Sequence, residues 1–168
     1  MPAIGTTRFN SQTWKENTNW RKANNYKGCI YGTPVRTKDN ITTGDIIFIM
    51  EMNNDDNKVG GIGLVKNLIY ADKYYKIYKD GNYNRYIYKS QYRIDRSELT
   101  AYEAKIIEIF DTLLFTGSKH LKRGQGITVV PKWLITNKHI DFIKFFKKMF
   151  LERFGKIKIN SWNCDLNI

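Results

Sequence analysis

Residues suited to covalent or proton-transfer chemistry are few in this chain. It has two cysteines, Cys29 and Cys164, and two histidines, His120 and His139. A thiol beside an imidazole could form a nucleophile and base pair, since such partners meet in space rather than along the chain. None of the four stands in a local catalytic motif, and Cys29 lies in an apolar run typical of a small core residue. We therefore expect no enzyme active site.

Motifs for metals and nucleotide cofactors are incomplete. A phosphate-binding P-loop requires spaced glycines followed by Lys and Ser or Thr, and neither residues 60–63 nor residues 123–126 fit this pattern. A zinc deaminase requires His-x-Glu and Pro-Cys-x-x-Cys, which two isolated cysteines cannot supply. The adjacent acids Asp55 and Asp56 lie in an Asn-rich turn, which is typical of a solvated loop. The sequence predicts neither a metal nor a cofactor.

The charge of the chain is its most unusual property. Lys and Arg number 28 against 16 Asp and Glu, which gives a net charge of +12 and a pI near 9.6. Such a field favours polyanions, and an aromatic content of 14% provides surface on which bases can stack. We expect nucleic acid as the partner, because neutralising phosphates releases counterions. The alternative explanation of the high lysine content is codon bias from an AT-rich genome, which would scatter the positive charge over the surface.

Two segments concentrate cations. The loop at 117–126 places three of them between glycines, which let the backbone approach a phosphate. In residues 85–94, positions two apart share one face by the period of a strand. The predicted phosphate-binding residues are Lys119, Lys122, Arg123, Arg85, Lys89 and Arg93. Either segment can instead be an ordinary solvated surface, on which charge is normal.

Hydrophobic patterns predict the strands that position these residues. The apolar run at 46–52 predicts a buried strand, and the aliphatics alternating with glycines at 59–65 predict a strand that another backbone or a ligand approaches closely. Residues 74–79 and 85–94 predict a hairpin. A short strand is expected at 127–130 and an edge strand at 157–162.

Helix signals lie mainly in the second half of the chain. Thr100 and Glu103 form a capping-box pattern before an apolar repeat at helical spacing that ends near Gly117. A second helix is predicted over about 138–154, closed by Gly155.

The chain is expected to form one α+β domain over residues 1–168. Within it, residues 1–27 are predicted to wrap the core and residues 28–95 to form a β-rich core. Residues 96–168 are predicted to contain a helix, the basic loop, a strand and a helix.

The order of motifs in residues 30–65 resembles a known superfamily. The chain reads Ile30-Tyr31-Gly32-Thr33-Pro34, a spacer, the turn Gly44-Asp45, an apolar strand and Gly60-Gly61-Ile62-Gly63-Leu64-Val65. This order, over about a fifth of the chain, is similar to the PUA-like superfamily, especially its EVE, ASCH and YTH branches. The resemblance implies a small mixed β-barrel or strongly curved sheet, here flanked by two main helices. It also implies binding of RNA or DNA, in several members with a modified or flipped base in an aromatic pocket.

The resemblance also indicates where a base pocket would lie. Tyr31, Thr33 and Pro34 match the turn by position, and Asn53 follows the next strand, where a contact to a base edge is expected. Trp14 and Trp20 are candidates for its walls, since a base stacked on an aromatic ring gains ~1–3 kcal/mol. Packing in the core is the alternative for both tryptophans.

The sequence therefore predicts a non-catalytic domain that binds RNA or DNA, including a modified or flipped base. The alternative is a basic structural or packaging protein, such as a viral one, that binds nucleic acid or an acidic partner non-specifically. No apolar run reaches the roughly 20 residues of a membrane span, and the N-terminus lacks a secretory signal. An intracellular location, in the cytoplasm, the nucleus or a virion, is expected.

Overall fold

The computed structural model describes residues 2–38 and 40–157. Its strands are β1 (Ala3–Phe9), β2 (Cys29–Thr33), β3 (Ile46–Asn53), β4 (Lys58–Lys66), β5 (Tyr86–Ser90), β6 (Arg93–Asp95) and β7 (Thr128–Val129). The α-helices are α1 (Ser11–Ala23), α2 (Ala101–Phe115), α3 (Lys132–Ile135) and α4 (Phe142–Phe154). Two short 3-10 helices are η1 (Gly81–Asn84) and η2 (Arg96–Glu98).

Five of the strands form one mixed sheet in the order β6-β4-β3-β1-β7. β1 runs parallel to β3, and the other neighbours in this sheet are antiparallel. β2 and β5 form a second, antiparallel sheet. The predicted α+β class is confirmed, and the strand pairs of the described residues make two sheets rather than one closed barrel.

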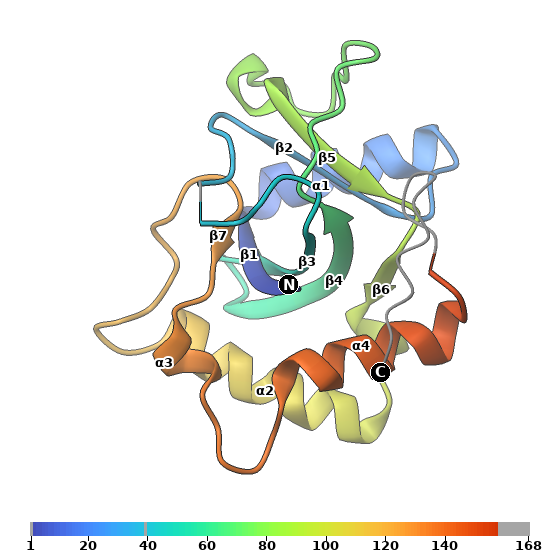
Figure 1. The fold of residues 1–168 in the computed structure, drawn as a ribbon. Coiled ribbons are helices and arrows are strands. Elements are labelled where there is room, and N and C mark those ends of the chain that lie inside the picture. Colours follow the sequence, from blue (N-terminus) through green and yellow to red (C-terminus); the bar gives the residue numbers. More distant parts are fainter. Residues whose placement is uncertain (1, 39, 158–168) are drawn as a thin grey trace.

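The central sheet separates two hydrophobic cores. Successive side chains of a strand point to opposite faces, so Phe48 packs among the residues of α2 and α4 while Ile47 and Ile49 pack toward β2 and β5. The Phe48 ring stacks on Phe146 of α4, with 5.6 Å between the ring centroids. In Figure 1, α2 and α4 lie below the sheet, and β2, β5 and α1 lie above it. The protein is thus a layered structure with the sheet in the middle.

Glycines of β4 allow the upper layer to approach closely. A Cβ on Gly63 would lie 2.0 Å from the Tyr31 hydroxyl oxygen, and one on Gly60 would lie 2.2 Å from the Trp14 ring. Another backbone or a ligand was predicted to approach this strand, but the groups that do so at Gly60 and Gly63 are side chains of α1 and β2.

The N-terminal segment contributes an interior strand that its composition did not predict. β1 pairs with β3 on one side and with β7 on the other. Thr6 and Thr7 are both buried although they are polar, so the segment lacks the apolar pattern that would predict a strand. The Thr6 hydroxyl lies 3.1 Å from the Thr128 hydroxyl on β7, so this buried group has a partner.

The predicted hairpin of residues 74–79 and 85–94 is wrong. β5 pairs with β2, β6 pairs with β4, and residues 74–79 form no strand. The buried Asn84 replaces the missing partners: its Oδ1 accepts from the N–H groups of Ile77 and Tyr78, and its Nδ2 donates to the Tyr78 carbonyl. One side chain thereby provides the hydrogen bonds to backbone N–H and C=O groups that a paired strand would otherwise provide.

Helices α2 and α4 follow their local signals closely, whereas α1, in the segment expected to wrap the core, was not predicted. The Thr100–Glu103 capping box opens α2, and Gly155, at φ 62°, follows the last residue of α4. α4 begins at Phe142, later than predicted, because Asp141 caps it. Most of the predicted edge strand, residues 158–162, lies outside the described residues. Among the described helices, none has both the length and the apolar composition needed to cross a membrane.

Candidate functional site

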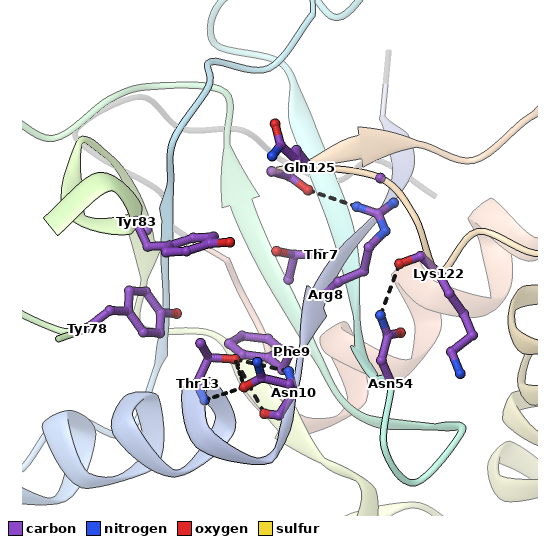
Figure 2. A pocket seen from close by; sticks show the side chains of 13 residues that line it. Thr7, Arg8, Phe9, Asn10, Thr13, Asn54, Tyr78, Tyr83, Lys122 and Gln125 are labelled. Atoms are coloured by element: carbon purple, nitrogen blue, oxygen red, sulfur yellow. Dashed lines mark hydrogen bonds between the residues drawn. The ribbon is translucent and has the colours of Figure 1, made fainter. Parts of the chain in front are cut away.

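A cavity of about 200 Å³ lies where β1 ends and α1 begins. Figure 2 shows it between two tyrosines on one side and the basic loop on the other. The labelled side chains that line it are Thr7, Arg8, Phe9, Asn10, Thr13, Asn54, Tyr78, Tyr83, Lys122 and Gln125. Sites for drug-sized ligands occupy roughly 300–1,000 Å³, so this cavity suits a single ring system.

Tyr78 and Tyr83 form the aromatic side of the cavity. Their rings meet edge to face, with centroids 6.1 Å apart. Tyr78 is buried, and its hydroxyl accepts from Asn17 Nδ2 at 3.0 Å, whereas Tyr83 is 38% exposed. A Cβ on Gly32 would lie 2.2 Å from the Tyr83 carbonyl oxygen, so a glycine here lets β2 approach η1. Tyr78 is fixed in place, and Tyr83 presents ring surface to a ligand.

Arg8 holds the basic loop against β1 on the opposite side. Its Nε donates to the Leu121 carbonyl at 2.7 Å, and its Nη1 donates to the Gly126 carbonyl at 3.1 Å. A Cβ on Gly124 would lie 2.5 Å from the guanidinium carbon, so the loop backbone rests on the cation. Burial lowers the pKa of Arg8 to about 10, which keeps it charged at neutral pH. Arg8 has no carboxylate partner among the described residues, and its charge therefore acts on the cavity.

Polar atoms that face the cavity lack partners within the described residues. Asn54 donates through Nδ2 to the Lys122 carbonyl at 3.0 Å, but its buried Oδ1 accepts no hydrogen bond. The Thr7 hydroxyl and the Gln125 amide also make no hydrogen bond to the rest of the described chain. Buried polar atoms are normally hydrogen-bonded, so Asn54 Oδ1 is suited to a polar ligand, and the exposed Gln125 amide lies at the rim of the same cavity.

The first turn of α1 lies at the same place, and its partial positive charge is opposed by a carboxylate. Asn10 caps the helix by accepting from the Thr13 N–H at 2.8 Å, and the helix dipole directs partial positive charge toward this end. The Ser11 N–H donates to Asp55 at 2.6 Å. Hydrogen bonding from the side chain of Ser11, then from its backbone, with a smaller effect of Lys122, holds the pKa of Asp55 below its usual range. The Lys122 ammonium donates to Asn57 Oδ1 at 2.7 Å.

The pocket residues inferred from the resemblance do not line this cavity. The buried Tyr31 hydroxyl donates to Glu51 at 2.8 Å, and the Thr33 hydroxyl donates to a backbone carbonyl. Asn53 is also buried, with its amide 3.1 Å from Asp56, and Pro34 is half-buried beside the strand.

Sequence neighbours of these residues line the cavity instead. Gly32 lies between Tyr31 and Thr33, and Asn54 follows Asn53. Successive residues of β2 point to opposite sides of the strand. An error of one residue along the strand therefore exchanges a residue that faces the cavity for one that faces away from it. The residues inferred from the resemblance are thus adjacent in sequence to two residues of the cavity wall but are not part of that wall.

Trp14 and Trp20 pack against other aromatic rings. Trp14 meets Phe9 edge to face, with centroids 5.3 Å apart, and lies over Gly60. Trp20 contacts Tyr26 and Tyr75 at 5.7 and 6.1 Å. Neither tryptophan lines the cavity.

The structure divides the predicted phosphate-binding residues into two groups. On the basic loop, Lys122 lines the cavity, Arg123 is exposed, and the Lys119 ammonium lies 5.4 Å from the centroid of Trp133. In residues 85–94 the cations do not form one face. Arg85 is exposed beside Tyr86, Lys89 lies among Tyr26, Tyr70 and Tyr75, and Arg93 pairs with Glu51 and Asp95.

The residues considered for catalysis are not brought together where they are described. Cys29 is buried with its Sγ 3.6 Å from the Ser90 hydroxyl, and burial raises the pKa of its thiol. His120 accepts from the Lys122 N–H in the basic loop, and His139 is exposed. Cys164 lies outside the described residues. Within the part of the chain that the structure describes, no three potential ligands gather for a metal ion.

Sequence reasoning missed most of the cavity. Thr7, Arg8 and Asn10 belong to a segment without strong periodicity, and Tyr83 lies in the turn of the supposed hairpin. The Asn10–Thr13 cap was the one local signal that could have placed a helix start here. Comparisons of the chain with family models, with curated proteins and with solved structures found no match.

Proposed function

We propose that this protein is a non-catalytic nucleic-acid-binding domain that holds one base in the cavity between β1, α1 and the basic loop. The observation that carries the proposal is a convergence of three kinds of group on one base-sized space. They are an exposed aromatic ring, polar atoms without partners among the described residues, and cations that form no ion pair there.

Each kind of group has a role in this proposal. Tyr83 provides a surface for stacking, while Thr7, Asn54 and Gln125 offer donors and acceptors to the edge of a base. Lys122 and the exposed Arg123 contact the flanking phosphates, which supply affinity without sequence preference. Binding of a base by its edge and of its phosphates by cations requires no catalytic side chain.

The PUA-like assignment is part of the same proposal. Gly44-Asp45 leads into β3, and β3 pairs with the glycine-rich β4, in agreement with the order of motifs that the resemblance uses. The strands β1 and β4 curve strongly in Figure 1, which supports the curved-sheet form of that fold.

The basic loop is tested by removing its charge. We expect Lys122→Ala with Arg123→Ala to weaken the binding of a labelled oligonucleotide, measured by fluorescence anisotropy, for all sequences alike. The dependence of log affinity on log salt should become shallower, by roughly one unit per lost phosphate contact. The control is Lys144→Ala with Lys148→Ala, which removes the same charge from exposed positions on α4.

Equal losses in the two double variants would contradict the proposal and favour the packaging alternative, in which only total charge matters. A panel of oligonucleotides with and without modified bases separates the two further. A base-binding protein should prefer one base by about tenfold, equivalent to ~1.4 kcal/mol. A packaging protein should show no preference.

A further inference from the structure

Trp133 is a large aromatic side chain left on the surface. It lies on α3 and is 50% exposed, whereas Trp14 and Trp20 are packed against other rings. The exposed face of an indole ring is a surface on which a base can stack. The Lys119 ammonium lies over this ring, 5.4 Å from its centroid. Trp133 therefore combines an open ring surface with an adjacent cation.

The basic loop connects Trp133 to the cavity. Lys119 contacts Trp133, and Lys122, three residues later, lines the cavity. Three residues of extended chain span at most about 11 Å, so the Cα atoms of the two lysines lie within that distance. Arg8 anchors the loop at Leu121, between the two lysines. Each end of this short segment therefore places a lysine near an aromatic ring: Lys119 lies beside Trp133, and Lys122 lines the cavity that also contains Tyr83.

We propose that the ligand is single-stranded, with one base in the cavity, a second base stacked on Trp133, and the phosphates between them bound by Lys119 and Lys122. This inference rests on the proposed function and specifies its ligand. Single strands fit because their bases can separate and stack on protein rings one by one. A duplex with one flipped base offers a single free base, and its remaining ring faces stay stacked on each other.

The test compares ligands of different length on the Trp133→Ala variant. Mononucleotides and single strands of two to six nucleotides compete with a labelled hexanucleotide, and a duplex of the same sequence is a separate arm. We expect Trp133→Ala to bind mononucleotides as the native protein does and to bind the longer strands tenfold or more weakly. Trp133→Tyr should restore most of the affinity, because it restores a ring. Tyr102→Ala, which removes another exposed ring, from α2, should change neither.

Tryptophan fluorescence gives a second readout on the folded protein. The emission of Trp133 is the difference between the native protein and Trp133→Phe. A hexanucleotide should quench this emission, and a mononucleotide should leave it unchanged. Equal losses of mononucleotide and hexanucleotide affinity in Trp133→Ala, or no loss, would overturn the inference, as would a duplex that binds as tightly as the single strand. Failure of the cavity itself would look different, since Tyr83→Ala would then leave mononucleotide binding intact.

Discussion

Arg93 and Glu51 form a buried ion pair on the sheet face that β2 covers. The Nη2 to Oε2 distance is 2.7 Å, and the two side chains are 6% and 4% exposed. Tyr31 donates to the same carboxylate at 2.8 Å. Burial acts to lower the pKa of Arg93, but the charge and hydrogen bonds of Glu51 raise it overall. The guanidinium is therefore engaged inside the protein, and we leave Arg93 out of the proposed phosphate contacts.

Removing Arg93 should lower the free energy of unfolding, because its guanidinium is paired inside the protein. Arg93→Met leaves the Glu51 carboxylate buried without its cation, and we expect a loss of about 3–5 kcal/mol in the free energy of unfolding. Arg85→Met, at an exposed position eight residues earlier, should change it by less than about 0.5 kcal/mol. Urea unfolding measures both. Similar small changes in the two variants would show that the pair is not buried as described.

Residue types identified one wall of the cavity but not most of the residues that line it. Cations and glycines identified the basic loop, and Lys122 does line the cavity. The period of two could not tell Tyr31 from Gly32, because both faces of β2 have neighbours in the fold. Arg85 and Arg93 are alike in sequence pattern, and only the position of Glu51 distinguishes them.

At the scale of elements, the start of α2 is tied to the end of α4. Thr100 and Glu103 cap α2 reciprocally, and the Arg153 guanidinium contacts the Glu103 carboxylate at 2.6 Å. The hydrogen bond from Arg153, opposed by burial, holds the pKa of Glu103 below its usual range. Two helices that cover one face of the sheet are thus joined by one carboxylate.

This contact predicts a particular dependence of stability on pH. A carboxyl with a lowered pKa in the folded state stabilises it above its pKa in the unfolded chain, near 4.3, and loses this contribution as the pH falls through the folded value. Glu103→Gln should therefore lower the free energy of unfolding by about 1–3 kcal/mol at pH 7. The difference from the native protein should shrink toward pH 3, as followed by urea unfolding. A difference that is constant with pH would exclude the charge as its cause.

Elements with strong local signals were predictable, and those without them were not. Capping residues and a terminal glycine fixed α2 and the end of α4, since these signals act within one helical turn. The supposed hairpin failed because a single buried amide, Asn84, replaces strand pairing. β1 was missed because its polar Thr6 finds its partner on β7, 122 residues away.

At the scale of the whole molecule, Arg8 joins parts of the chain that the sequence cannot show as neighbours. It bonds the Leu121 and Gly126 carbonyls across 113 and 118 residues. This contact places the basic loop beside the first turn of α1 and so creates one wall of the cavity. Net charge alone could not show where the basic loop lies, because its position depends on these long-range contacts.

A base bound in the cavity at the end of β1 should change the surroundings of the backbone amides that line it. These changes can be followed as amide chemical shifts by NMR during titration with a single-stranded hexanucleotide. We expect the amides of Thr7, Asn10, Tyr83 and Gln125 to shift together and to saturate at one equivalent. Shifts that spread over the lysines of α4 and leave these four amides unchanged would contradict binding in the cavity.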